Sequence, residues 1–308
     1  MANEIMSIAG PRGALEGEAI IVPHGKAGII IIPGSGPTDR NGNGPMGLHT
    51  DTYKLLAESL SEAGFSTLRI DKRGFFGSKN AVTDAEAVTI EDYANDVRLW
   101  HAAFTERLGA SFMWIAGHSE GGLVALVAAA RLVQPCGLIL LSTPGRRISD
   151  LMREQFRRNP ANTSYLPELD RLISSLERGE LQSEASISAV LRPLFRQGLQ
   201  RYMMTLFSYD PARLAAGLEN PALVLQGDKD VQVTPHDARL LSNALPKASL
   251  KIIPGVTHML KQDVPGAPFA TYQDASLPLG AEVTPAIVSF IQSFHLNSAN
   301  DGAGCEGE

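Results

Sequence analysis

A serine lies among glycines in the segment Gly117-His118-Ser119-Glu120-Gly121-Gly122. The apolar run Phe112–Ala116 precedes this segment, and the helix-like stretch Leu123–Leu132 follows it. Strand, Gly-x-Ser-x-Gly and helix in this order are typical of a nucleophile elbow. That turn is so tight that a Cβ two residues before or after the serine would collide with backbone. The turn is expected to lift the Ser119 hydroxyl above the carboxyl edge of a sheet, ready to attack a carbonyl carbon.

A carboxylate and a histidine follow Ser119 in the order that a catalytic triad requires. A serine hydroxyl becomes a good nucleophile when a histidine takes its proton and a carboxylate orients that histidine. Asp230 comes soon after the apolar run Ala222–Gln226, and His258 comes soon after Leu250–Ile253. Because the carboxyl ends of parallel strands meet at one edge of a sheet, we predict that both residues reach Ser119.

The acid has an alternative two residues earlier, at Asp228. Asp230 is preferred because it lies farther into the loop and directly precedes the apolar Val231, whereas Asp228 suits a turn or a cap. Of the seven histidines, His258 is the only one well placed as the base. The others precede the elbow, fall on or at the start of helical patterns, or, like His118, adjoin the nucleophile without an easy way to turn back to it.

An attacked carbonyl develops a negatively charged oxygen, which needs N–H donors to stabilise it. The glycine-rich loop Pro33–Pro45 follows the apolar run Gly28–Ile32 and is able to aim backbone N–H groups into a cleft. The start of the helix after Ser119 offers another donor. We predict the backbone N–H groups of Ser35 and Glu120 as the oxyanion hole. The side chain of Glu120 is expected to face solvent or to lie at the helix N-terminus.

Six short apolar runs must position these groups. They lack the alternation of half-exposed strands and are therefore predicted to be buried strands. They are Gly28–Ile32, Thr67–Ile70, Phe112–Ala116, Gly137–Leu141, Ala222–Gln226 and Leu250–Ile253. Helical patterns occur at Asp51–Gly64, Glu91–Leu108 and Pro285–Phe294. The alternation of strand and helix predicts an α/β protein whose mostly parallel sheet is covered on both faces.

One long stretch breaks the alternation. From Arg146 to about Gly217 the sequence has no convincing strand, but it has amphipathic patterns at Pro167–Arg178 and Ile187–Phe207. A helical cap inserted over the sheet is predicted, with further crossover helices as the alternative. The expected divisions are a core over residues 1–145 and 218–296, a cap over 146–217 and a flexible tail over 297–308.

The composition excludes several classes of protein. With 44% apolar and 19% charged residues among 308, intrinsic disorder is excluded. The 27 basic and 33 acidic residues form no basic block, so no nucleic-acid partner is expected. The two cysteines lack the paired spacing of a zinc site, and neither a metal nor another cofactor is predicted. No apolar run approaches the ~20 residues that span a bilayer, and no signal peptide is evident, so a cytoplasmic protein without a membrane partner is expected.

Three segments together resemble the α/β-hydrolase superfamily, and within it the bacterial serine carboxylesterases of the EstD type. They are Pro33-Gly-Ser-Gly-Pro-Thr-Asp-Arg40, Arg69-x-Asp-Lys-Arg-Gly74 and His118-Ser-Glu-Gly-Gly122. The resemblance covers about Ala14 to Phe294. It implies an eight-stranded, mostly parallel sheet, a helical cap and ester hydrolysis without a cofactor. Carried over by motif, it also implies Ser119 as nucleophile, Asp230 as acid and His258 as base.

Two segments depart from the superfamily pattern. Many members have His-Gly where this chain has Pro33-Gly34, and this bears on the oxyanion donor of the first loop. Phe75-Phe76 stand after Arg73-Gly74, where a second glycine is common. These two phenylalanines are expected either to shape an apolar pocket or to pack under the cap.

The predicted function is hydrolysis of small-molecule carboxylic esters with small to medium apolar acyl groups through an acyl-enzyme. Thioesters, lactones and peptides pass through the same kind of oxyanion, so they remain alternative substrates. Apolar cap residues such as Leu191, Phe195 and Phe207 suggest an uncharged acyl or alcohol group, or form the core of the cap. The arginines of the cap suit an acyl-CoA, or keep the cap soluble: Arg153, Arg157 and Arg158.

Two other classes of function fit the sequence less well. Gly42–Gly47 matches G-x-G-x-x-G, the fingerprint of dinucleotide binding. Its first glycine lies about ten residues past the strand, and Pro45 would occupy the phosphate-binding turn, which argues against a nicotinamide oxidoreductase. A binding module that has kept the fold but lost catalysis is disfavoured, because serine, acid and histidine are all present in order.

Overall fold

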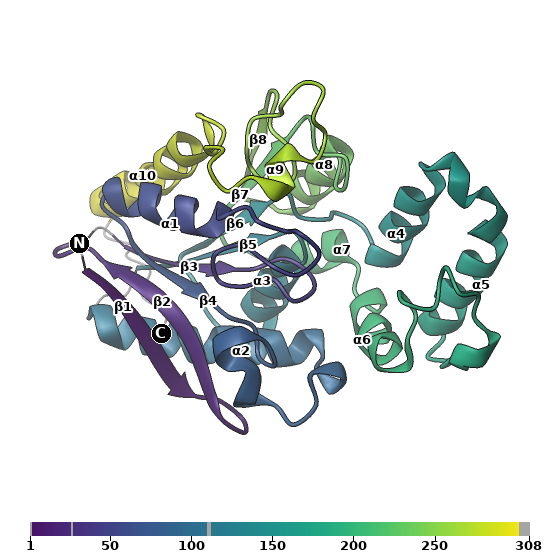
Figure 1. Ribbon diagram of the computed structural model, residues 1–308. Helices are drawn as coiled ribbons and strands as arrows, with labels where there is room; N and C mark the ends of the chain where they lie inside the picture. The colour runs from purple at the N-terminus through teal and green to yellow at the C-terminus, as the bar shows by residue number, and fades with distance from the viewer. Residues whose placement is uncertain (1, 26, 110–111, 302–308) are drawn as a thin grey trace.

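The computed structural model describes residues 2–25, 27–109 and 112–301. These residues form an eight-stranded sheet in the order β1-β2-β4-β3-β5-β6-β7-β8 (Figure 1). The strands are β1 (Ala2–Ala9), β2 (Ala14–Ile21), β3 (Gly28–Ile32), β4 (Ser66–Ile70), β5 (Met113–His118), β6 (Gly137–Leu141), β7 (Ala222–Gly227) and β8 (Ala248–Ile253). Strand β2 pairs antiparallel with both β1 and β4, and the remaining pairs are parallel. The predicted α/β fold with a mostly parallel sheet is confirmed.

All six predicted strands are present, but β1 and β2 were not predicted. Buried and half-exposed residues alternate along most of β2, so this strand lacks the continuous apolar run used to recognise the others. In β3, by contrast, Ile29 and Ile31 face one apolar layer while Ile30 and Ile32 face the other. A strand covered on both faces therefore reads as an unbroken apolar run.

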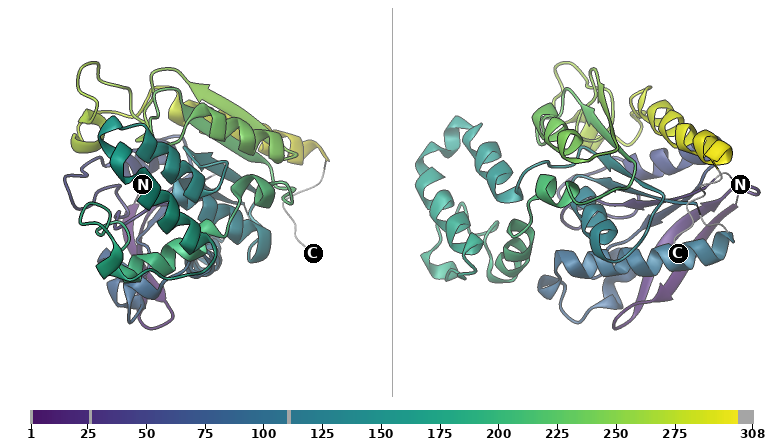
Figure 2. Two further views of the ribbon diagram at one scale, coloured as in Figure 1. Left: turned by 90° about the vertical axis from the view of Figure 1, so that its right-hand side faces the viewer. Right: turned by 180° about the vertical axis from the view of Figure 1, so that it is seen from behind.

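Helices cover both faces of the sheet, as Figures 1 and 2 show. One apolar layer contains residues of α1 (Thr52–Glu62) and α10 (Val283–Asp301). The other contains residues of α2 (Ile90–Leu108), α3 (Glu120–Arg131) and α8 (Pro235–Ala244). The short helices are η1 (Phe76–Ala81), η2 (Ala85–Ala87), η3 (Pro160–Tyr165), η4 (Glu184–Ser186) and α9 (Ala270–Gln273).

Local sequence signals set the ends of α2. Thr89 and Asp92 form a capping box at its start, each side chain accepting a backbone N–H of the other residue. Gly109 ends the helix with φ 59°, a conformation that glycine adopts without steric cost. The helix therefore begins and ends where its sequence requires.

The chain between β6 and β7 is helical throughout its regular elements. It contains α4 (Ile148–Arg157), α5 (Leu166–Glu177), α6 (Gln197–Phe207) and α7 (Pro211–Ala215). Helices α4 to α6 stand as a group beside the sheet in Figure 1, whereas α7 packs against α3 and α8. The helix predicted over Ile187–Phe207 begins only at Gln197, because Pro193 lacks the N–H that a continuous helix needs.

The C-terminal part of the chain forms α10, which extends to Asp301. Residues 297–301, which were expected to belong to a flexible tail over residues 297–308, are therefore part of this helix. Residues 302–308 lie outside the described part of the chain.

A chain of buried hydrogen bonds joins four segments at the carboxyl edge of the sheet. The Gly34 N–H donates to the Tyr53 hydroxyl over 2.9 Å, and that hydroxyl lies 2.8 Å from His118 Nδ1. On the other side of the ring, His118 Nε2 lies 2.8 Å from the His258 backbone carbonyl. Because a carbonyl only accepts, Nε2 must carry the proton, and Nδ1 then accepts from Tyr53.

Both side chains in this network are neutral. Burial, with a smaller effect of the neighbouring His258, lowers the pKa of His118 to about 3. Burial also raises the pKa of Tyr53. The network thus places no charge in the core and keeps one fixed set of donors and acceptors.

We expect His118→Gln to weaken the dependence of stability on pH. Glutamine retains an N–H for the His258 carbonyl and an oxygen for the Tyr53 hydroxyl, but it does not titrate. The unfolded chain protonates His118 near pH 6.5, whereas the folded protein does so only near pH 3. The stability that neutral His118 contributes is therefore complete above pH 6.5 and is lost as the pH falls toward 3, by about 1.4 kcal/mol per pH unit.

Urea unfolding at pH 7, 6 and 5 measures this difference. The free energy of unfolding should fall with decreasing pH less steeply in His118→Gln than in the wild type, by about 1 kcal/mol per pH unit below pH 6. Equal slopes in the two proteins would contradict a neutral, buried His118.

Candidate active site

Strand β5 passes into helix α3 at Ser119 without an intervening loop. The backbone there has φ 54° and ψ −120°, a region that residues other than glycine rarely adopt. A Cβ on Gly117 would lie 2.2 Å from the Gly121 carbonyl oxygen, and one on Gly121 would lie 2.5 Å from that of Ile32. The glycines around Ser119 are therefore required by the close approach of three backbone segments.

The structure brings Asp230 and His258 together. Asp230 Oδ2 lies 2.7 Å from His258 Nδ1, and both side chains are almost completely buried. The carboxylate is also held by the Gln226 side-chain amide at 2.9 Å and by the backbone N–H groups of Gln232 and Val233 at 2.8 and 2.9 Å. Four donors therefore fix the Asp230 carboxylate, and a proton on His258 Nδ1 leaves Nε2 free to act as a base.

The surroundings of Asp230 favour its charged form. Burial by itself would raise the pKa of Asp230, but the adjacent His258 and the donated hydrogen bonds hold it below its ordinary value. Asp228, the alternative acid, is exposed and accepts the Gly255 N–H at 2.7 Å instead. In this arrangement Asp230, and not Asp228, orients the His258 ring.

Ser119 and His258 border one cavity of about 160 Å³. The lining residues are Gly34, Ser35, Thr38, Gly42, Leu48, Tyr53, His118, Ser119, Gln232, His258, Met259 and Tyr272. Within the described residues, no hydrogen bond joins the Ser119 hydroxyl to the His258 ring. The two groups thus share a cavity wall without being in direct contact through a hydrogen bond.

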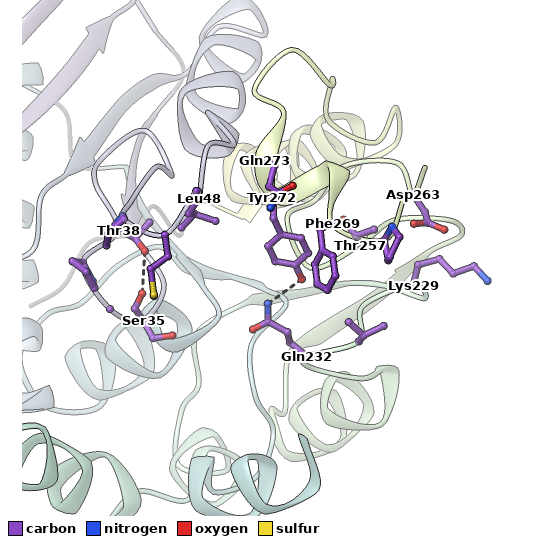
Figure 3. A pocket seen from close by; sticks show the side chains of 17 residues that line it. Ser35, Thr38, Leu48, Lys229, Gln232, Thr257, Asp263, Phe269, Tyr272 and Gln273 are labelled. Carbon is purple, nitrogen blue, oxygen red and sulfur yellow. Dashed lines mark hydrogen bonds between the residues drawn. The ribbon is translucent and has the colours of Figure 1, made fainter. Parts of the chain in front are cut away.

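Two backbone N–H groups, one in a residue that lines this cavity and one in the residue after Ser119, lack an acceptor among the described residues. Ser35 lines the cavity, and Glu120 is the first residue of α3, where helix N–H groups have no partner within the helix. Within the described part of the chain, neither backbone N–H has a hydrogen-bond acceptor. The loop around Ser35 is stabilised by the Thr38 hydroxyl, which donates to the Ser35 carbonyl over 3.0 Å (Figure 3).

Of the two expectations for the side chain of Glu120, the one that it faces solvent is wrong, whereas Glu120 does lie at the N-terminus of α3. It is buried, and its Oε1 lies 3.2 Å from the Nζ of Lys72, whose side chain is equally buried. A carboxylate is tolerated in the core when a cation offsets the cost of removing it from water. The partner, Lys72, lies 48 residues earlier in the chain, where a local sequence pattern gives no indication of the pairing.

A larger groove adjoins this cavity, with a volume of about 740 Å³. Five residues line both: Ser35, Thr38, Leu48, Gln232 and Tyr272. Figure 3 shows Leu48 and Ser35 on one side of the groove and Phe269 and Tyr272 on the other, with the Gln232 amide donating to the Tyr272 hydroxyl over 2.9 Å. The groove is therefore continuous with the space at Ser119, and much of its wall is apolar.

Three groups of residues singled out in the sequence lie elsewhere. Apolar residues of the insertion, among them Phe195 and Phe207, are buried in the hydrophobic core rather than lining either cavity. The Phe75-Phe76 pair also lines neither, and Phe76 is exposed. The three arginines are paired with acidic neighbours: Arg153 with Glu177, Arg157 with Asp170 and Arg158 with Glu154.

Sequence reasoning missed several residues that build the site. The segment with Phe269 and Tyr272 forms one wall of the groove, but its strand or helix pattern is too short to predict an element there. Gln226 ends the predicted strand Ala222–Gln226, and a polar residue at the end of an apolar strand was the available signal. Tyr53 had no signal, because its hydroxyl acts on residues far away in the chain.

Neither a membrane-spanning helix nor a metal-binding cluster is found among the described residues. No helix there is long and apolar enough to cross a membrane. No group of three or more histidine, cysteine, aspartate or glutamate side chains is arranged there to hold a metal ion.

The chain resembles one curated protein over part of its length. Residues are 26% identical to esterase EstD of Thermotoga maritima over 228 positions, which cover 72% of this chain and 51% of the relative. The chain thus spans about half the length of this curated relative.

Solved structures with the same fold include enzymes of different activity. A thermophilic esterase from Thermogutta terrifontis has a TM-score of 0.58 at 20% identity, covering 95% of this chain and 99% of its own. Est1E from Butyrivibrio proteoclasticus, solved with ferulic acid, has a TM-score of 0.59 at 18% identity, with coverages of 96% and 99%. Proline iminopeptidase of Mycobacterium smegmatis has a TM-score of 0.61 at 16% identity, with coverages of 95% and 100%. At these identities the likeness shows the α/β-hydrolase fold.

Residues 45–265 match the family model described as serine aminopeptidase, S33. This match spans more than half of the chain, and the sheet order and the solved relatives agree with the α/β-hydrolase fold. The chain belongs to this family of α/β hydrolases.

Proposed function

We propose that this protein is a serine carboxylesterase that cleaves esters with apolar groups through an acyl-enzyme. The observation that carries the proposal is the buried Asp230–His258 pair, 2.7 Å apart, at the cavity that Ser119 also lines. In this arrangement each group has one role. Ser119 is the nucleophile, His258 the general base and acid, and Asp230 the carboxylate that orients and stabilises the imidazolium.

The reaction proceeds in two halves. Ser119 Oγ forms a bond to the ester carbonyl carbon while His258 Nε2 takes the hydroxyl proton, and the carbonyl oxygen becomes an oxyanion near the N–H groups of Ser35 and Glu120. The carbon–oxygen bond to the alcohol then breaks, and the alcohol leaves with the proton from His258. A water molecule, deprotonated by His258, attacks the acyl-enzyme and releases the acid and Ser119. A hydrogen bond from a catalytic hydroxyl to its base, here from Ser119 to His258 Nε2, often tightens only when substrate is bound.

The lining of the cavity favours an ester over an aminopeptidase substrate. An enzyme that binds a free α-amino group needs an acidic or otherwise accepting site close to the nucleophile. None of the described residues that line the cavity at Ser119 is acidic. The adjoining groove has one carboxylate, Asp263, and its opposing walls hold Leu48 and Phe269.

The surroundings of the arginines in the insertion also favour an ester over an acyl-CoA. Arg153, Arg157 and Arg158 each form ion pairs with carboxylates of the same helical region. Phosphate groups of CoA would have to displace those carboxylates. An uncharged ester does not require this exchange.

We further propose that residues 146–217 act as a cap on the core formed by residues 1–145 and 218–296. Helix α4 contacts the loop that carries Asp230, since the Gln155 side chain donates to the Gln232 carbonyl over 3.0 Å. A movement of α4 would therefore reach the loop next to the catalytic acid.

Substitution of the proposed triad should abolish ester hydrolysis. With p-nitrophenyl butyrate at pH 7 to 8, Ser119→Ala and His258→Ala are expected to lower kcat/KM by roughly three or more decades, since each removes a member of a unit. Asp230→Asn should cost about three to four decades, because the amide favours the wrong histidine tautomer. Asp228→Asn is the matched control and should remain within about threefold of the wild type, as it keeps an acceptor for the Gly255 N–H.

Full activity of Ser119→Ala, or an inactive wild type, would contradict the proposal. A higher kcat/KM on butyryl-CoA or on an amino-acid p-nitroanilide than on the ester would replace the ester as the substrate class.

The groove should contribute to binding of long apolar chains. Phe269 is 66% exposed on the groove wall, so Phe269→Ser removes apolar contact for a ligand with little effect on folding. We expect kcat/KM for p-nitrophenyl octanoate to fall by roughly three- to tenfold and that for the acetate to stay within about twofold. Phe76→Ser, at a position that is 41% exposed and outside the groove, is the control. Equal losses on both esters would remove the groove from the substrate site.

A further inference from the structure

The segment after β4, Asp71-Lys72-Arg73, contains three buried charged side chains that bind three different parts of the molecule. Asp71 accepts from the Arg40 side chain at 2.7 Å and from the Arg40 N–H at 2.8 Å, which holds the glycine-rich loop. Arg73 pairs with Asp96 of α2 at 2.6 Å. Lys72 lies between them and extends toward the cavity at Ser119. The proposed ester hydrolysis assigns no role to this lysine.

Lys72 is hydrogen-bonded to both halves of the proposed oxyanion hole. Its Nζ donates to the Gly34 carbonyl over 2.7 Å and lies 3.2 Å from Oε1 of Glu120. The Gly34 carbonyl belongs to the same peptide unit as the Ser35 N–H. Glu120 supplies the second N–H from its own backbone. One buried ammonium thus contacts the carbonyl of the Gly34–Ser35 peptide and the side chain of Glu120, which are not the proposed donors themselves.

The contact between Lys72 and the Gly34 carbonyl also fixes the direction of the Ser35 N–H, because both groups belong to one planar peptide. No peptide bond among the described residues is cis, and in a trans peptide the C=O and N–H point in opposite directions. With its carbonyl fixed on Lys72, the Gly34–Ser35 peptide directs the Ser35 N–H away from the ammonium. Ser35 is one of the residues that border the cavity.

The other side of Gly34 is fixed as well. Its N–H donates to the Tyr53 hydroxyl, and a Cβ there would lie 3.3 Å from His118 Nδ1 and 3.4 Å from Ser119 Cβ. The peptides on the two sides of Gly34 are therefore each held by one buried hydrogen bond, the Pro33–Gly34 peptide through its N–H and the Gly34–Ser35 peptide through its carbonyl. A carbonyl that accepts from a cation is also more strongly polarised, which makes the N–H of the same peptide a better donor.

The environment keeps the ammonium in place. Its Nζ lies 5.1 Å from the centre of the Tyr93 ring, over its face, and the side chain of Lys72 is 3% exposed. Burial, with a smaller effect of the charge of Glu120, raises the pKa of Tyr202, a buried residue of α6. Among the described residues, the Lys72 ammonium contacts Glu120, the Tyr93 ring and the Gly34 carbonyl.

We infer that Lys72 is a positioning residue for the oxyanion hole: its buried ammonium orients the Gly34–Ser35 peptide and ties it to the first turn of α3 through Glu120. This inference rests on the proposed hydrolase function. Its consequence is specific to the transition state, because the Ser35 N–H acts on the oxygen that becomes charged during the reaction and much less on the bound ester.

Lys72→Met tests the inference, with Arg73→Met as the matched control. Both substitutions remove a buried cation and leave a buried carboxylate without it, but Arg73 faces α2 and not the oxyanion loop. For Lys72→Met we expect kcat on p-nitrophenyl butyrate to fall by roughly 10- to 100-fold with KM within about threefold, somewhat less than the loss of a direct donor. Arg73→Met should keep kcat within about threefold of the wild type. Its melting temperature should fall by about as much as that of Lys72→Met.

A second readout separates orientation from general damage. An alkyl trifluoromethyl ketone adds to the serine hydroxyl and places a negatively charged oxygen in the oxyanion hole. Its inhibition constant should rise in Lys72→Met by the same factor by which kcat/KM falls, and it should be unchanged in Arg73→Met. If Lys72→Met does not fold, the double variant Lys72→Met/Glu120→Gln leaves no unpaired charge in the core and retains the Glu120 N–H. It should show the same loss of kcat and the same weaker inhibition.

The outcomes distinguish this inference from the proposed function. An inactive wild type would overturn both. If the wild type is active, the role of Lys72 can be overturned without the proposed function. This would follow if folded Lys72→Met, or the double variant, kept both kcat and the inhibition constant within about threefold of the wild type. Equal losses of kcat in Lys72→Met and Arg73→Met would also overturn it, because they would show a general effect of disturbing this segment.

Discussion

Strand β5 enters helix α3 at a single residue, Ser119, whose backbone is held at φ 54° and ψ −120°. The turn is possible only because glycines on either side let three backbone segments approach within distances that no Cβ allows. The sharpness of the turn leaves the Glu120 N–H without a helical partner and places the serine at the cavity wall. The position of Ser119 and the unpaired N–H of Glu120 are therefore two consequences of one constraint.

Polar groups buried around this turn are matched to specific partners. Neutral His118 links Tyr53 to the His258 backbone, the Asp230 carboxylate has four donors, and the Glu120 carboxylate faces Lys72. In a medium of low polarity an unmatched group is costly, so these networks fix the loops in one arrangement. The loops at the carboxyl edge that carry Asp230, His258 and Ser35 are held by such contacts together with backbone hydrogen bonds.

Six of the eight strands and the tight turn at Ser119 were predictable because each depends on a local pattern, whereas β1 and β2 were not predicted. An unbroken apolar run indicates a strand covered on both faces, and glycines around a serine indicate the tight turn. The parts that were not predictable depend on partners distant in the chain. The side chain of Glu120 was expected to face solvent or to lie at the helix N-terminus, and nothing near it in the sequence indicates its buried ion pair with Lys72. The groove wall at Phe269 and Tyr272 was not predicted because its one helix, α9, is only four residues long.

The proposed reaction requires a charged oxygen between the N–H groups of Ser35 and Glu120 when Ser119 reacts. The most direct measurement is a crystal structure after treatment with ethyl p-nitrophenyl butylphosphonate, a reagent that phosphonylates reactive serines. We predict phosphorus bonded to Ser119 Oγ, the phosphoryl oxygen about 3 Å from both nitrogen atoms and His258 Nε2 next to Ser119. An unmodified protein, an adduct on another residue, or a phosphoryl oxygen that contacts neither N–H group would contradict the account.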